Sequence, residues 1–268
     1  MNTLSLSLSL SLSLSLSLFL LQFTYLYSYS VGKDDLPFWS KKKTIQTYLE
    51  QVNRENKVLE YTLFQPGLFL DYLASPFKTT KYVTPLDTFF NFQERRAIVV
   101  EGHEESAVVA LTAVKDIVDI VVRAVDDPRE WPRDGGVRGN RVSVAEVIRI
   151  GERVRGMFCF ALAFFLCGNA GLIDTKNTGA PFTVEKVRLE DLQAGKLVTS
   201  WSLDKRHPGF SENQAGELEA MLKMVLIATL LSAAKGAWDV SDAWNQRFPD
   251  HQFAGAEEFL GEVWKDKP

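Results

Sequence analysis

The sequence predicts an α/β fold, and three observations lead to this prediction. Apolar residues recur at helical spacing within residues 44–52, at Ile45, Tyr48, Leu49 and Val52. Short runs rich in β-branched, aliphatic and aromatic residues have the composition of strands, at 58–64, 97–100 and 107–111. A second helical pattern follows at 114–125. Helical patterns that alternate with strand-like runs are typical of α/β proteins.

The composition is that of an ordinary globular chain. The chain has 268 residues, of which 46% are hydrophobic and 24% charged, so it can bury a sizeable core in one large or two small domains. A net charge of -4 and a pI of about 5.5 predict no nucleic-acid partner. Basic residues are scattered except at Lys41, Lys42 and Lys43, so charge indicates no membrane partner either.

The cysteines do not form a metal-binding pattern. The 2 cysteines, Cys159 and Cys167, lie in one apolar run with no His or Cys at metal-ligand spacing around them. Such cysteines are typically buried thiols. We therefore predict no metal site, and cysteine usage does not indicate an oxidising compartment.

Residues 1–32 differ in composition from the rest of the chain. Ser and Leu alternate over residues 5–18, and the first charged side chain is Lys33. The alternation has the period of a strand, although serine is a poor strand former. It also fits the apolar part of a secretory signal, although no basic side chain precedes it. We favour a low-complexity leader before a domain at 33–268 of a cytoplasmic protein, and a secreted or membrane-targeted protein is the alternative if 1–30 is a signal.

A helix, a strand and a tight loop follow one another near the start of the predicted domain. The helical pattern breaks at 53–57, and the strand-like run 58–64 ends just before Pro66 and Gly67. In α/β sheets, ligands bind beyond the carboxyl ends of the strands. We therefore expect a small molecule to bind at residues 65–71.

Four stretches of the sequence resemble one known family. They are YTLFQPGLFLDYL after a lysine-bearing helix, LTAVKDIVDIVVRAVD, EWPRDGGVRGNRVSVAEV and GAWDVSDAWNQRFPD, at residues 61–73, 111–126, 130–147 and 236–250. They resemble the NmrA-like and isoflavone reductase-like group of atypical short-chain dehydrogenases, in particular its fungal members, over most of 35–268. The resemblance implies a truncated Rossmann-like parallel sheet with a C-terminal mixed α+β substrate lobe. It also implies NADP(H) as cofactor and a small organic molecule as substrate.

The resemblance implies roles for individual residues as well. In the reductase branch of the family, a lysine on the helix before the strand faces the nicotinamide and can act as general acid or base. Alignment of the helix gives this role to Lys42, although three successive lysines also fit a solvated helix start. The expected cofactor-binding residues lie in the loop beyond the strand, at Gln65, Pro66, Gly67 and Phe69. The expected substrate pocket is formed by Tyr72, Trp238 and Trp244.

One motif of the family is missing from the sequence. Members normally open with a strand and a GxxGxxG turn, whose backbone amides approach the cofactor pyrophosphate. The nearest string of glycines is Gly135, Gly136 and Gly139, and no buried strand precedes it, so we expect a surface turn there. Each lost charge-assisted hydrogen bond is worth roughly 1.5–3 kcal/mol. We therefore predict weak or no cofactor binding by this chain.

The next predicted elements are a loop, a turn and a helix. Residues 76–85 are expected to form a loop over the site, and His103 is expected to be solvated in a turn rich in acidic residues. Thr112 is the expected N-cap of the helix at 114–125. This helix should pack on the sheet through an apolar stripe of Val114, Ile117, Val118, Val121, Val122 and Val125.

Short strands and helices are predicted for the rest of the domain. A strand at 141–143 leads through a capping box, Ser143 and Glu146, into a helix at 144–155. A strand and two helices follow, at 183–189, 189–195 and 217–233.

An uninterrupted apolar run lies at residues 157–167, and it is too short to span a bilayer. It fits a buried strand or helix. It also fits a non-native insertion at 157–178 from a retained intron, because joining residue 156 to 179 restores the short connection that the family resemblance implies.

Two functions from different classes are open on the sequence. No Ser-His-Asp set, paired-carboxylate motif, Walker loop or metal-ligand spacing is present. One function is an NADP(H)-dependent oxidoreductase of the isoflavone reductase-like type, with Lys42 assisting protonation. The other is a non-catalytic NmrA-like protein that senses a dinucleotide or binds a protein partner. The chain also fits an inactive fragment, so whether it is an enzyme is open.

Overall fold

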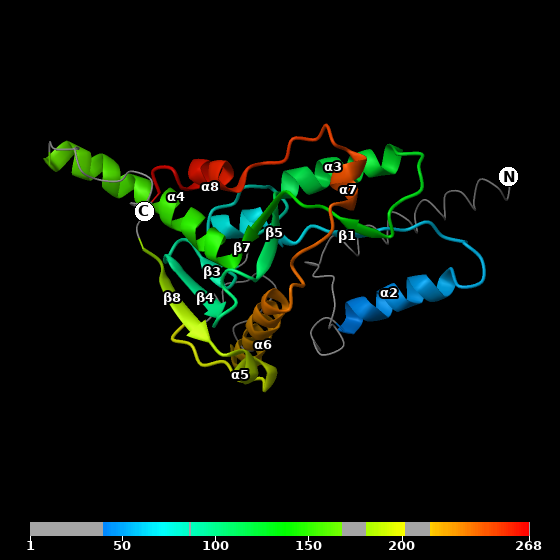
Figure 1. The fold of residues 1–268 in the computed structure, drawn as a ribbon, viewed down its shortest axis with the longest axis horizontal. Helices are drawn as coiled ribbons and strands as arrows, with labels where there is room; N and C mark the ends of the chain where they lie inside the picture. The colour runs from blue at the N-terminus through cyan, green and yellow to red at the C-terminus, as the bar shows by residue number, and fades with distance from the viewer. Residues whose placement is uncertain (1–39, 86, 168–180, 202–214, 268) are drawn as a thin grey trace.

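The computed structural model describes residues 40–85, 87–167, 181–201 and 215–267, without the side chains of 40–43, 157–167 and 215–218. The fold is α/β, as the sequence predicts, with helices around short parallel and mixed sheets (Figure 1). In chain order the elements are α2 (Ser40–Val52), β1 (Leu63–Gln65), β2 (Leu68–Phe69), the 3-10 helix η3 (Leu70–Ala74), β3 (Phe90–Asn91), β4 (Arg96–Val100), β5 (Val108–Thr112), α3 (Val114–Asp126), β6 (Asp134–Gly136), β7 (Asn140–Ser143), α4 (Val144–Cys167), β8 (Thr183–Val187), α5 (Leu189–Gln193), α6 (Ala215–Ala234), α7 (Ala243–Arg247) and α8 (Ala256–Trp264).

The strands form three small sheets. β1 pairs in parallel with β6, and β2 pairs in parallel with β5, whose other neighbour β7 is antiparallel. β4 lies between antiparallel β3 and parallel β8. Pro66 and Gly67 separate β1, which pairs with β6, from β2, which pairs with β5. Pro66 has no N–H to donate to a neighbouring strand, and the φ of Gly67 is 69°, so the strand is interrupted at these two residues. The described strands are therefore mixed in direction, not a single parallel sheet.

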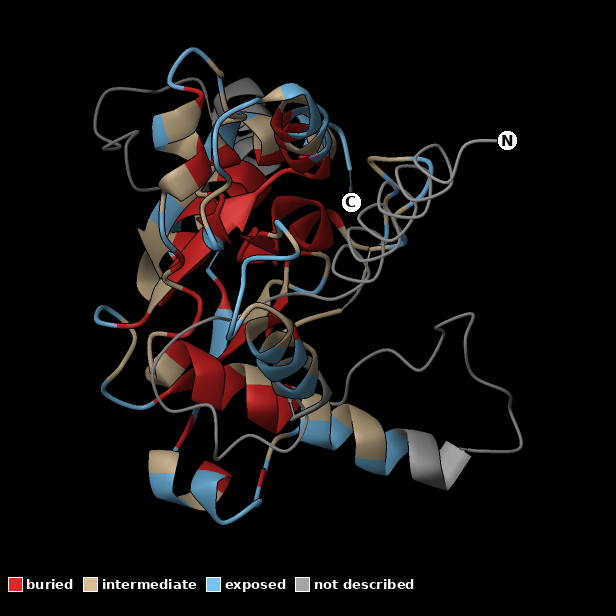
Figure 2. Ribbon diagram, turned by 90° about the vertical axis from the view of Figure 1, so that its right-hand side faces the viewer, coloured by how far each residue is buried: buried red, intermediate tan, exposed pale blue. Residues whose placement is uncertain are grey.

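The core is centred on β4 and β5. Residues 97–100 and 109–111 are at most 5% exposed, and Figure 2 shows the buried segments gathered between helices with exposed outer faces. These two strands confirm the predictions for 97–100 and 107–111. The predicted strand at 58–64 is wrong for residues 58–62, where the Asn53 carboxamide accepts the backbone N–H groups of Val58 and Leu59 and folds the start of the segment into a loop.

Glycines 135 and 136 form a buried strand, so the predicted surface turn is wrong. In β6, Gly135 lies opposite Phe64 and Gly136 lies opposite Gln65. A Cβ on Gly135 would collide with Trp244 and one on Gly136 with the Ser241 backbone. The absence of side chains therefore allows the segment around α7 to pack directly on this strand.

Helix α3 confirms the predicted helix at 114–125, but its predicted N-cap is wrong. The residue at the N-cap position is Ala113, which makes no side-chain capping bond. Asp71 Oδ2 accepts the Val114 N–H at 2.7 Å from another part of the chain. The Thr112 hydroxyl donates instead to the Val137 carbonyl at 3.0 Å, which removes it from a capping role.

The apolar stripe of α3 divides between core and solvent. Val114 and Ile117 are 5% and 1% exposed, whereas Val118, Val122 and Val125 are 44%, 58% and 53% exposed. Ile120 and Ala124 complete the buried face. The helix has apolar residues on two faces, and only one of these faces is buried. The valine periodicity therefore placed three of the six residues of the stripe on the buried face when they lie on the exposed one.

Helices α2 and α4 confirm two predicted helices with different packing. In α2, Leu49 is 1% exposed, but Tyr48 is 61% exposed, so the predicted core stripe is narrower than expected. In α4, the Glu146 N–H donates to Ser143 Oγ at 3.1 Å, which is one of the two bonds of the predicted capping box. The Glu146 carboxylate pairs instead with Arg149 and Arg153. The same helix continues through the apolar run at 157–167, whose side chains lie outside the described residues.

The later elements confirm the predicted strand at 183–189 and the predicted helices at 189–195 and 217–233, as β8, α5 and α6. The predicted leader at 1–32 and residues 168–178 of the proposed insertion lie outside the described residues. No described helix combines the length and apolar character that a membrane crossing requires.

Candidate functional site

The candidate site is the chain segment from β1 to η3, which lies where parallel strands end. Gln65 ends β1 opposite Gly136, and Phe69 ends β2 opposite Thr112. Gly67 joins the two strands, and its Cα lies so close to the Ala110 carbonyl that a Cβ would collide with it. Tight packing and a left-handed φ thus both require glycine at this position.

Gln65 is the most unusual polar residue of the segment. It is 2% exposed, and its backbone carbonyl accepts the Val137 N–H at 3.0 Å. Its side-chain Nε2 has no hydrogen-bond partner within the described part of the chain. A buried amide donor without an acceptor costs free energy, so a ligand carbonyl at this position would be stabilised.

Asp71 connects the segment to its surroundings. It is 3% exposed, and one carboxylate oxygen accepts the Thr79 hydroxyl at 2.5 Å while the other caps α3 through Val114. The predicted loop at 76–85 is therefore bonded to the site by its Thr79. In the sequence analysis Asp71 lies at the end of the expected binding segment 65–71 without a role of its own, although a single carboxylate inside the apolar run LFLDYL was the signal that could have revealed it.

Phe69 and Tyr72 form the aromatic part of the segment. Their rings pack edge to face with centroids 5.4 Å apart, and they are 7% and 8% exposed. Burial raises the pKa of Tyr72 to about 12, and the negative charge of Asp71 adds to this shift. The Tyr72 hydroxyl is therefore protonated at neutral pH and can donate a hydrogen bond.

The two tryptophans predicted for the substrate pocket are fully buried. Trp238 is 0% exposed and its Nε1 donates to the Thr229 carbonyl at 3.1 Å. Trp244 is 0% exposed and lies between the rings of Phe64 and Phe248, with centroids 5.3 and 5.7 Å away. The structure thus brings Trp244 next to β1 through Phe64, whereas Trp238 packs against α6.

Lys42 lies in the first turn of α2, and its side chain is outside the described residues. The rest of α2 contacts the protein through Leu49 and through Glu50, which pairs with Arg133. These contacts orient the C-terminal half of the helix. The role of Lys42 stays a prediction.

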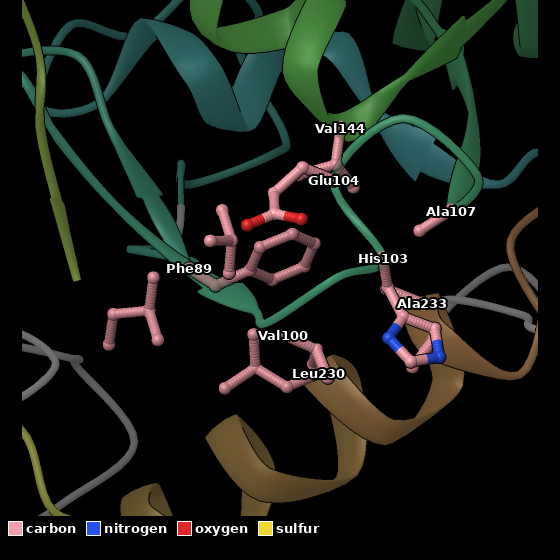
Figure 3. A pocket seen from close by; sticks show the side chains of 11 residues that line it. Phe89, Val100, His103, Glu104, Ala107, Val144, Leu230 and Ala233 are labelled. Atoms are coloured by element: carbon pink, nitrogen blue, oxygen red, sulfur yellow. The ribbon is translucent and has the colours of Figure 1, made fainter. Parts of the chain in front are cut away.

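A small cavity lies near the end of β4 (Figure 3), lined by Phe89, Val100, Glu104, Val144 and Leu230 among others. Its free volume of about 10 Å³ is that of one water molecule. The Glu104 carboxylate, which lines the cavity, pairs with Lys186 at 2.9 Å, and this contact lowers the pKa of Glu104. The cavity is too small for an organic substrate.

His103, in the turn beside this cavity, is half-buried, and its Nδ1 lies 3.0 Å from the Glu101 carbonyl. It is therefore less solvated than the sequence suggested. Within the described residues, His, Cys, Asp and Glu side chains do not gather in groups of three or more that could hold a metal ion.

Comparisons with known proteins give two relatives. Over 211 residues the chain is 28% identical to a protein of Arthroderma benhamiae named Oxidoreductase swnN, in a match that covers 78% of this chain and 63% of the relative. Over 100 residues it is 30% identical to the Oxidoreductase swnN of Metarhizium robertsii, in a match that covers 37% of this chain and 29% of the relative. The chain is similar to oxidoreductases. It spans less than two thirds of the length of these relatives, and neither a protein-family model nor a solved structure matches it.

Proposed function

We propose that the chain forms the substrate-side part of an NADP(H)-dependent oxidoreductase of the NmrA-like, isoflavone reductase-like type, acting on a small organic molecule. The observation behind this proposal is the 28% identity with an oxidoreductase across 78% of the chain. The parallel pairs β1–β6 and β2–β5 support a Rossmann-like arrangement of the strands that bear the site.

The residues beyond β1 suit the nicotinamide end of a dinucleotide. Gln65 offers a buried N–H donor that has no acceptor among the described residues, and the ring of Phe69 lies on the following strand. The phosphates of a dinucleotide need a cradle of backbone amides, and the sequence has no GxxGxxG turn to supply it. We therefore expect Gln65, Pro66, Gly67 and Phe69 to contact the cofactor in a weak complex.

In this proposal the bound cofactor supplies the hydride, and residues of the chain orient the substrate and move a proton. Lys42 would donate the proton, because an ammonium near the reacting atoms can act as general acid. Tyr72 would donate a hydrogen bond, since its raised pKa keeps the hydroxyl protonated. Trp244 would support the pocket from behind, through its stacking on Phe64.

The test is a fluorescence titration with NADPH up to millimolar concentration, followed by turnover assays with a panel of small carbonyl and enone compounds. We expect weak binding and slow NADPH oxidation. Lys42→Gln should lower kcat by about 100-fold with little change in KM for NADPH, the loss expected on removal of a general acid. Lys43→Gln removes the same charge from the next position and should leave kcat unchanged.

A non-catalytic dinucleotide sensor or protein-binding regulator is the second candidate. The missing glycine-rich turn favours only the protein-binding form of this candidate, because binding a protein partner does not need a cofactor. Absence of NADPH oxidation by a folded sample with every compound of the panel would contradict the oxidoreductase proposal and support this candidate. A cytoplasmic location stays a prediction for both.

A further inference from the structure

A groove of about 380 Å³ lies at the amino-terminal ends of β1 and β6. Gln65 lies at the other, carboxyl-terminal end of β1. Its walls are the last turn of α2, the loop that leads into β1 and the loop that leads into β6. The volume is in the range of small-molecule sites. Charged and aromatic side chains line it, including Glu50, Lys57, Glu60, Tyr61, Trp131 and Arg133.

Three contacts hold the walls of the groove together. Lys57 Nζ lies 2.6 Å from a carboxylate oxygen of Glu130, and Arg133 pairs with Glu50. The backbone N–H of Trp131 donates to Glu60 Oε1 at 2.8 Å. Two of these contacts join the loop before β1 to the loop before β6, and the Glu50–Arg133 pair joins the last turn of α2 to the loop before β6. The groove is therefore formed before any ligand binds.

The charges of the groove favour a cation. Both of its basic residues, Lys57 and Arg133, already pair with carboxylates. Glu60 accepts a backbone N–H and makes no ion pair in the part of the chain that the structure describes, and its charge acts on Lys57 only at longer range, where it helps to raise the pKa of that ammonium. The groove has three carboxylates, at Glu50, Glu60 and Glu130, against its two basic side chains, so one negative charge is in excess. The last turn of α2 contains no basic residue, and its Glu50 borders the groove. The partial negative charge of a helix C-terminus adds to that of Glu60.

The aromatic side chains of the groove favour the same ligand. Tyr61 and Trp131 are half-buried, and the Trp131 ring is held by edge-to-face packing on Trp244 at 6.3 Å. The faces of aromatic rings attract organic cations, most strongly where water is partly excluded. Burial is the main cause that raises the pKa of Tyr61, so its hydroxyl adds no negative charge at neutral pH.

We propose that this groove binds a small organic cation, an ammonium group on a compact carbon frame, next to Glu60 and between Tyr61 and Trp131. The site is separate from the segment at Gln65 and does not depend on the proposed oxidoreductase function. Ligands of α/β sheets usually bind at the carboxyl ends of strands, so a ligand at this opposite end would not compete with a molecule bound beyond Gln65.

The test compares choline with 3,3-dimethyl-1-butanol, which has the same shape without the charge, by calorimetric titration of the full chain. We expect saturable binding of choline. The neutral alcohol should bind about 2- to 30-fold more weakly, because this is the range of affinity that a cation–aromatic contact contributes. Glu60→Gln keeps the acceptor for the Trp131 N–H and should reduce choline affinity by a similar factor. Glu262→Gln removes one exposed carboxylate from α8 and should leave the affinity unchanged.

Circular dichroism would establish that each variant is folded. Equal affinity for choline and the neutral alcohol would overturn the proposal. So would the absence of saturable choline binding by the folded wild-type chain, or an equal loss of affinity in the Glu60 and Glu262 variants.

Discussion

At the scale of single residues, buried polar groups distinguish the segment from β1 to η3. Asp71 bonds both the loop at Thr79 and the first turn of α3 at Val114. Next to it, Tyr72 is 8% exposed with its hydroxyl protonated over an unusually wide pH range. Ionisation of a phenol in an apolar interior is costly, so this segment should respond to alkaline pH.

The raised pKa of Tyr72 predicts that the folded chain becomes less stable at alkaline pH. Its pKa is about 12 in the folded chain, against about 10 in an unfolded one. Below pH 10 the phenol is protonated in both states, and above it the unfolded state loses the proton first. The free energy of unfolding should therefore fall between pH 10 and 12, by about 1.4 kcal/mol at pH 11 from this residue.

The measurement is urea unfolding of the wild-type chain and of Tyr72→Phe at pH 8 and pH 11. The variant should lose about 1.4 kcal/mol less than the wild type between the two values. Tyr82→Phe is the control, because Tyr82 is 88% exposed. Identical pH dependence of wild type and Tyr72→Phe would show that the phenol is not shielded from water.

At the scale of elements, β6 explains how α7 packs beside the site. Its glycines leave space into which Trp244 and Ser241 fit, and Ser241 Oγ accepts the Gly136 N–H at 3.2 Å. Asn245 bonds both the N–H and the carbonyl of Arg138. Side chains of the α7 segment thus take the hydrogen-bonding positions of a neighbouring strand at this edge.

Gly136→Ala should destabilise the protein by about 1–3 kcal/mol, because the new methyl group would overlap backbone atoms of Ser241 that cannot rotate away. Chemical denaturation monitored by circular dichroism measures the change. Gly261→Ala is the matched control, and it should change the stability in the opposite direction. Gly261 lies in helix α8, and a Cβ there would meet no atom within 4 Å, so alanine should stabilise the chain by up to about 1 kcal/mol.

At the scale of the whole molecule, the C-terminal helix joins distant parts of the chain. α8 packs on α4 and on η3 (Figure 1). Trp264 Nε1 donates to the Leu73 carbonyl at 3.2 Å, and the Arg155 guanidinium lies 4.4 Å above the Trp264 ring. Arg155 also donates to the Lys267 carbonyl at 3.1 Å. The site segment is therefore held in part by residues 191 positions later.

Trp264→Phe should lower the free energy of unfolding by about 1–3 kcal/mol, because it removes the bond to Leu73 and leaves that buried carbonyl without its donor. Hydrogen exchange of amides 70–74 should also become faster, since η3 loses a contact. Val198→Ala, at a position that is 90% exposed, should change neither quantity. Unchanged exchange in Trp264→Phe would mean that α8 does not hold η3.

Much of the fold could be predicted because its signals are local. The periodicity of 114–125 and the composition of 97–100 and 107–111 are properties of adjacent residues, and α3, β4 and β5 confirm them. The end of β1 before Pro66 was predictable for the same reason. The roles given to Lys42, Gln65, Tyr72 and the tryptophans stay predictions, since each needs a bound ligand to test it.

The sequence by itself determined the α/β class, the order of most elements and the position of the loop after β1. Tertiary structure decided that Asp71 caps α3, that Gly135 and Gly136 are buried, and that Val122 faces solvent. The physical reason is that each of these outcomes depends on a partner distant in the chain. A cap needs a nearby carboxylate, a buried glycine needs a side chain that fills its space, and a buried valine needs a surface to cover it.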